Sequence, residues 1–162
     1  MDAILKKLSY GHYIVTSRKP AEDMTTRRED YLAAGTVSWV MQSSFEPPML
    51  AIAVRMDSDL HETIEKSYHF AVHVLTEGQD HLVKSFGQAS EITPGTINGI
   101  AYTIDEEGLP VLADVVGYID CVVEQTMRSG DHMICLGKVR KATLNHDATP
   151  LNTARSAYYY AN

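Results

Sequence analysis

The sequence lacks the short motifs that mark most common enzyme classes. It contains no GxSxG nucleophile turn, no Walker loop and no GxGxxG fingerprint, which argues against the usual hydrolases, nucleoside triphosphatases and dinucleotide-binding folds. It also contains no CxxC and no HExxH, and its 7 histidines are scattered along the chain. No metal site is therefore predicted.

Long apolar segments and strong positive charge are missing too. The longest aliphatic run, Met49 to Val54, is far shorter than the roughly 20 residues of a membrane helix. The N-terminus does not show the ordered parts of a secretory signal, so we expect a soluble, cytoplasmic protein. The formal net charge of −7, without a block of like charges, gives little support for a nucleic-acid partner.

Cysteine is scarce, with only Cys121 and Cys135. A tight turn at residues 128–131 would place Cys121 near Lys138 and Cys135 near Glu124 on paired strands. A disulfide needs neighbouring Cα atoms, so we expect two free thiols, as in a reducing compartment.

What the chain does contain is a series of short segments rich in β-branched and aromatic residues, most of them alternating in polarity. The predicted strands are His12–Ser17, Thr36–Gln42, Met49–Arg55, Phe70–Leu75, Tyr118–Met127 and His132–Lys141. Many short strands with few helices predict one mainly β domain over residues 1–162, either a barrel or a sandwich.

Two short helices are expected between the strands. Asp57 or Ser58 is suited to cap a helix whose buried stripe is Leu60, Thr63, Ile64 and Ser67. A second helix is predicted to begin near Thr76, where Thr76 and Gln79 have capping-box spacing, and to bury Leu82, Val83 and Phe86. The charged segment 18–31 is expected to be a solvated loop with a helical turn, and 92–99 an irregular excursion.

Three segments are candidates for chemistry. In Gly35–Arg55 a strand is followed by Ser43 and Ser44, whose N–H groups and hydroxyls are available to a ligand. In Arg55–Ile64 a helix N-terminus, with Arg55 and Ser58 beside it, is suited to hold an anion such as a phosphate. In Ser129–Val139 the histidine at position 132 follows a Gly-Asp turn. Taken singly, each segment is better explained as ordinary structure: a loop, a capped helix and a hairpin end.

Taken together and in this order, the segments resemble the flavin reductase-like family, the FMN-binding split barrels. The resemblance runs from about Leu8 to Thr143 and is densest in "SWVMQSSFEPPMLAIAV", "SYHFAVHVL", "GLPVLADVVGYIDCVV" and "GDHMICLGKV". It implies a six-stranded antiparallel Greek-key barrel with two or three short helices, a homodimer, and FMN rather than FAD as the cofactor.

The resemblance also assigns roles to residues. The residues expected to line the flavin ring and ribityl chain are Thr36, Ser38, Trp39, Gln42, Ser43 and Ser44. Arg55, Ser58 and His61 are expected at the flavin phosphate, and Phe86 in a loop that covers the ring. His132 is expected beside the flavin where the nicotinamide approaches, as a contact and not as a general acid or base. Backbone N–H groups near Ser43 and Ser44 would stabilise charge on the reduced flavin.

The family pattern is not matched everywhere. Ala33-Ala34-Gly35 precedes Thr36 where many relatives have an Asn-containing pair, and His61 stands where Thr is common. Three functions stay open: an NAD(P)H:flavin reductase that supplies a partner oxygenase, a flavoredoxin-like carrier with tightly bound FMN and a protein donor, and a barrel without a cofactor. NADH and NADPH are not distinguished.

Overall fold

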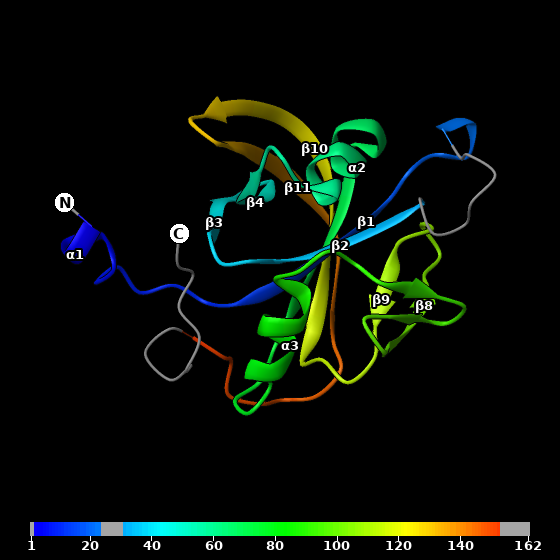
Figure 1. Cartoon of the computed structure of the whole chain (residues 1–162). Helices are drawn as coiled ribbons and strands as arrows, with labels where there is room; N and C mark the ends of the chain where they lie inside the picture. The colour runs from blue at the N-terminus through cyan, green and yellow to red at the C-terminus, as the bar shows by residue number, and fades with distance from the viewer. Residues whose placement is uncertain (1, 24–30, 153–162) are drawn as a thin grey trace.

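Two antiparallel sheets make up most of the structure, a computed structural model that describes residues 2–23 and 31–152 (Figure 1). The predicted mainly β fold is confirmed. The larger sheet has seven strands in the order β2-β1-β5-β10-β11-β4-β3. Its strands are β1 (Tyr13–Arg18), β2 (Leu32–Val37), β3 (Val40–Phe45), β4 (Pro48–Arg55), β5 (His69–Val74), β10 (Gly117–Ser129) and β11 (His132–Leu144).

The two edge strands of this sheet, β2 and β3, are consecutive in the chain. Val37 at the end of β2 pairs with Tyr13, whereas Val40 at the start of β3 pairs with Ile52 at the other side of the sheet. One continuous segment therefore serves both edges and makes the sheet curl into a split barrel. The prediction of a single strand Thr36–Gln42 was wrong because the chain changes partner at Ser38 and Trp39. The larger sheet has seven strands, so the count of six that the resemblance implied is not confirmed.

A smaller sheet lies to one side of the larger one, well away from β3 and β4 (Figure 1). It contains β6 (Ile92–Thr93), β7 (Thr96–Ile97), β8 (Ile100–Ile104) and β9 (Pro110–Leu112). The sequence predicted only an irregular excursion for part of this region. Strands of two to five residues are too short to show a clear alternation of polarity.

The helices are α1 (Asp2–Leu5), α2 (Asp59–Ser67) and α3 (Asp80–Phe86), with a 3-10 turn η1 at Ala21–Asp23. Ser58 caps α2 as predicted, by accepting a hydrogen bond from the His61 N–H. The predicted start of α3 near Thr76 was wrong. Gln79 accepts from the Thr76 N–H as a capping box requires, but the Thr76 hydroxyl donates to the Thr149 carbonyl, so the helix begins only at Asp80.

The barrel interior is filled by a cluster that includes Val15, Ile52 and Phe70 of three different strands. At Gly137 a Cβ atom would lie 2.6 Å from the Phe70 ring, so only glycine fits there. Leu82, Val83 and Phe86 of α3 are buried as predicted, in a second cluster that includes residues of the smaller sheet. None of the helices described is long and apolar enough to span a membrane.

Both cysteines are buried and free, as predicted. The predicted strand register was wrong by one to two residues, because Ser129 pairs with His132 and the turn contains only Gly130 and Asp131; irregularities at residues 120–121 and 123–125 then change the register further along the hairpin. Cys121 therefore lies opposite Val139, and Cys135 opposite Thr126. Of the charged segment, η1 is the helical turn that was expected, while residues 24–30 lie outside the described part of the chain.

Candidate functional site

A cavity of about 400 Å³ opens where the end of β4, the start of α2, strand β2, the segment after α3 and the β10–β11 turn meet. Seven of the eleven predicted site residues line it, from five separate parts of the chain: Thr36, Ser38, Trp39, Arg55, Ser58, Phe86 and His132. The register of the sheet explains why two of these residues are close together, since His132 at the start of β11 pairs with Arg55 at the end of β4.

The other four predicted residues do not line the cavity. Gln42, Ser43 and Ser44 lie on β3, beyond the Ser38–Trp39 junction, and the Gln42 amide donates to the Ser44 carbonyl. His61 is buried on α2, and its Nε2 atom has no hydrogen-bond partner among the described residues. The cavity wall therefore offers donors from the junction itself and not from the β3 serines.

The start of α2 forms one wall of the cavity and carries most of its charge. The Arg55 guanidinium donates to the Asp57 carboxylate through Nε at 2.9 Å and through a terminal nitrogen at 2.6 Å. This contact holds the pKa of Asp57 below its usual range. Both side chains are more than half exposed, and a surface ion pair of this kind contributes little to stability. Arg55 can therefore turn to an anionic ligand at little cost.

The β10–β11 turn contributes His132, whose side chain is 9% exposed. Its Nδ1–H donates to the Asp131 carboxylate at 2.7 Å, which lowers the pKa of Asp131. The Trp39 ring lies against the imidazole, with 4.7 Å between ring centroids and 43° between planes. A carboxylate on one nitrogen and an indole on the face thus hold the His132 ring in a defined orientation.

Two predicted hydroxyl ligands already make hydrogen bonds within the protein. Thr36 donates to the Val83 carbonyl of α3 at 2.7 Å, and the Ser38 hydroxyl bonds to the ring of fully buried His12 at 2.9 Å. These contacts position β2 and the junction that follows it. Their first role is to fix the shape of the cavity.

The segment after α3 forms the remaining wall. Phe86 reaches the cavity, but its side chain is 1% exposed and packs in the core, so little of the ring can face a ligand. The wall continues through Gly87, Gln88, Ala89 and Ser90, none of which was predicted from the sequence. Asp57 and Asp131 were not predicted as site residues either. Their closeness in sequence to Arg55 and His132 was a signal that could have identified them.

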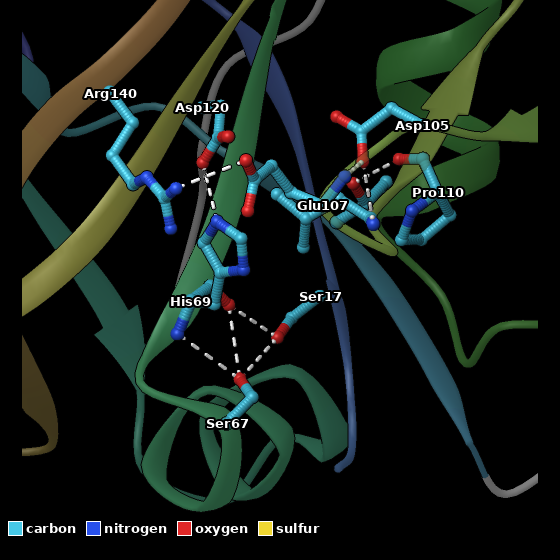
Figure 2. Close-up of polar contacts among 10 residues, drawn as sticks. Ser17, Ser67, His69, Asp105, Glu107, Pro110, Asp120 and Arg140 are labelled. Atoms are coloured by element: carbon cyan, nitrogen blue, oxygen red, sulfur yellow. Dashed lines mark hydrogen bonds and ion pairs between the residues drawn. The ribbon is translucent and has the colours of Figure 1, made fainter. Parts of the chain in front are cut away.

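A second polar cluster lies outside the cavity, between β5 and β10 (Figure 2). The His69 ring and the fully buried Asp120 carboxylate share a hydrogen bond of 2.5 Å between Nε2 and Oδ1. The hydroxyls of Ser17 and Ser67 both donate to the His69 carbonyl. None of the four lines the cavity, so we assign them to holding the strands together.

Comparison with known proteins agrees with this fold. The family model described as "Flavin reductase like domain" matches residues 5–162. A flavin reductase of Pseudomonas putida is 28% identical over 156 residues, covering 96% of this chain and 85% of that protein. The NADH:FAD oxidoreductase of Streptomyces globisporus has a TM-score of 0.77 at 23% identity, over 98% of this chain and 89% of its own.

Longer proteins also contain a similar segment. A diflavin flavoprotein of Nostoc sp. is 33% identical over 144 residues, which cover 85% of this chain but 25% of that protein. The high molecular weight rubredoxin of Moorella thermoacetica is 30% identical over 158 residues, or 96% of this chain and 64% of that protein. The chain thus spans between a quarter and two thirds of the length of these relatives.

Proposed function

The chain belongs to the flavin reductase-like family, and we propose that it is an oxidoreductase that passes electrons from NADH or NADPH to a flavin. The observation that carries the proposal is the cavity, whose wall combines Arg55 and a helix N-terminus with the Trp39–His132 pair. We also propose that residues 1–162 form one flavin-binding domain.

The residues present fit a flavin. The cavity volume of about 400 Å³ lies within the usual range for a small-molecule site, roughly 300–1,000 Å³. The first turn of α2 offers unpaired N–H donors and a positive dipole end, which together with Arg55 suit the flavin phosphate. Trp39, 45% exposed, offers an aromatic surface to a flat ring system.

A bound flavin supplies the electron sink, because its ring accepts a hydride from a reduced nicotinamide. The chain's own task is to hold the two rings in contact and to exclude water from between them. We assign Trp39 and His132 to the side on which the nicotinamide approaches. The Asp131 carboxylate keeps the His132 ring in place for this contact, without a proton transfer by His132.

We propose FMN as the flavin, since a cavity of about 400 Å³ suits a single ring system, and Arg55 beside the α2 N-terminus can hold one phosphate. Electron flow has two alternatives, and the first is a reductase that gives reduced flavin to a partner oxygenase. We further propose a homodimer, and a reducing compartment such as the cytoplasm because the two buried cysteines are unpaired.

One observation favours a second candidate function, a carrier with tightly bound FMN that receives electrons from a protein donor. The segment similar to this chain is only 25% of a protein named for two flavins. A domain built into such a chain is suited to keep its flavin and to exchange electrons with neighbouring domains.

An anaerobic reduction experiment separates the two. The purified protein is loaded with FMN, NADH is added and then NADPH, and the absorbance of oxidised flavin is followed. A reductase bleaches rapidly with one or both nucleotides. A flavin that stays bound and oxidised would support the carrier and contradict the reductase, and a protein that binds no FMN would contradict both.

The role of His132 is tested by His132→Ala. We expect kcat/KM for the nicotinamide nucleotide to fall on the order of tenfold, about 1.4 kcal/mol, with FMN affinity within about twofold of the original protein. His146→Ala is the control, because His146 is exposed and lies outside the cavity. Unchanged steady-state kinetics in His132→Ala would show that this histidine has no part in nicotinamide use.

A further inference from the structure

The charges around the cavity are mostly negative. Among the described residues that line it, Arg55 is the single lysine or arginine, whereas Asp57, Asp59 and Asp131 all carry carboxylates. A flavin phosphate would add a charge of about −1.5 to −2 at neutral pH. The cavity wall therefore repels a phosphate as well as attracting it, and the balance depends on how Arg55 is engaged.

The Asp57 carboxylate already occupies one edge of the Arg55 guanidinium. Nε donates to Oδ1 at 2.9 Å and a terminal nitrogen donates to Oδ2 at 2.6 Å, so both carboxylate oxygens are bound. Arginine binds a phosphate through the same pair of parallel N–H donors. A phosphate at the start of α2 must therefore displace the carboxylate or share the guanidinium with it. In both cases the charge of Asp57 stays close to the phosphate.

Asp57 carries its negative charge at neutral pH. The hydrogen bonds from Arg55 lower the pKa of Asp57, so its carboxyl group is ionised. The pKa of Asp131 is lowered too, mainly by His132 and to a smaller extent by Arg55. One guanidinium thus acts on two carboxylates before any ligand binds.

The local fold does not depend on the Asp57 carboxylate. Ser58 supplies the cap of α2 by accepting from the His61 N–H, and the Asp57 side chain is 68% exposed. Within the described part of the chain, no side chain other than Arg55 hydrogen-bonds to this carboxylate. Its effect is therefore exerted through Arg55 and on whatever anion Arg55 binds.

We propose that Asp57 is an internal competitor of the flavin phosphate, which engages Arg55 in the empty cavity and keeps the bound flavin exchangeable. The proposal rests on the proposed function and on the phosphate lying at the start of α2. An exchangeable flavin suits a reductase that releases reduced flavin, whereas a carrier needs its flavin to stay bound. Asp57 would then determine which of these two modes the site supports.

The test compares FMN with riboflavin, which has the same ring system and ribityl chain but no phosphate. Both are titrated by flavin fluorescence into the original protein and into Asp57→Asn, which keeps the size of the side chain and removes its charge. Asp147→Asn is the matched control, because it removes the same charge at an exposed residue outside the cavity. The rate of FMN dissociation is followed by fluorescence after dilution, and the titrations are repeated at high salt.

We expect Asp57→Asn to bind FMN about fivefold more tightly and to release it more slowly, while riboflavin affinity stays within about twofold of the original. Asp147→Asn should leave both affinities unchanged. High salt should reduce the gain for FMN, because exposed charges are screened.

Three results would overturn the proposal. An unchanged FMN affinity would show that Asp57 does not compete, and a weaker one would show that it orients Arg55 for the phosphate. An equal gain for riboflavin would place the effect away from the phosphate. If the original protein binds neither flavin, the proposed function fails and this inference fails with it.

Discussion

His73 is a residue whose protonation depends strongly on the fold. It is fully buried on β5, where its Nδ1 bonds to the Ile14 carbonyl at 3.0 Å and its Nε2 accepts from the Leu112 N–H at 3.1 Å. Since Nε2 accepts a hydrogen bond, the ring proton lies on Nδ1. Burial lowers the pKa of His73 from 6.5 to about 4, so the ring is neutral in the folded protein at ordinary pH.

This histidine makes stability depend on pH. Between pH 6.5 and about 4 the unfolded chain binds a proton at His73 that the folded protein does not, so the free energy of unfolding falls as pH falls. We expect a contribution of about 2–3 kcal/mol to be lost by pH 4.5. Urea denaturation at pH 7.0, 5.5 and 4.5 measures it, with His73→Gln as the variant that cannot titrate. Equal pH slopes for both proteins would contradict the assignment.

At the scale of elements, the start of α2 has two tasks. The Ser58 hydroxyl accepts from the His61 N–H and donates to the Arg55 carbonyl, so it both caps the helix and joins it to β4. The same turn lines the cavity at the position proposed for the flavin phosphate. Stability and ligand binding therefore share one residue, and substitutions can separate them.

Two variants of Ser58 make the separation. Ser58→Ala removes the cap and is expected to lower the free energy of unfolding by about 1 kcal/mol. Ser58→Asp keeps a capping acceptor for the His61 N–H, although it loses the hydrogen bond to the Arg55 carbonyl, and its negative charge repels a phosphate. We expect Ser58→Asp to weaken FMN binding about tenfold in a fluorescence titration. If it binds FMN as well as the original protein does, the phosphate is not at this helix.

At the scale of the whole molecule, several of the exposed apolar side chains lie on β3 and on the β10–β11 hairpin. Met41 and Phe45 on the edge strand β3 are 63% and 88% exposed, and Met127 near the β10–β11 turn is 61% exposed. Figure 1 shows this long hairpin arching over β3 and β4. An apolar edge strand of this kind is an aggregation hazard unless another chain covers it.

The interface of the proposed homodimer is expected to cover this surface, so Phe45→Ser should weaken the dimer. Light scattering after size exclusion at micromolar concentration is expected to give a dimer for the original protein and a larger monomer fraction for Phe45→Ser. Ile104→Ser is the control, since Ile104 is also exposed, at 44%, but lies on the smaller sheet. A monomeric original protein would contradict the homodimer, and a variant that is equally dimeric would place the interface elsewhere.

The sequence by itself determined the features that depend on neighbouring residues. Alternation of polarity located most strands of the larger sheet, the serine at position 58 located the start of α2, and the spacing of Leu82, Val83 and Phe86 located the buried side of α3. Each of these signals is complete within a few residues, because caps and amphipathic periodicity arise from local backbone geometry. The order of the segments was enough to indicate the family.

Only the tertiary structure decided which predicted site residues share a cavity. The partners of Thr36 and Ser38 are 47 and 26 residues away in sequence, and the break between β2 and β3 exists because each half finds a different strand to pair with. No short stretch of sequence shows which strand β2 or β3 pairs with, because this pairing follows from how the whole sheet curls. Gln42, Ser43 and Ser44 lie beyond this break and outside the cavity wall, which Gln88 and Ala89 line instead.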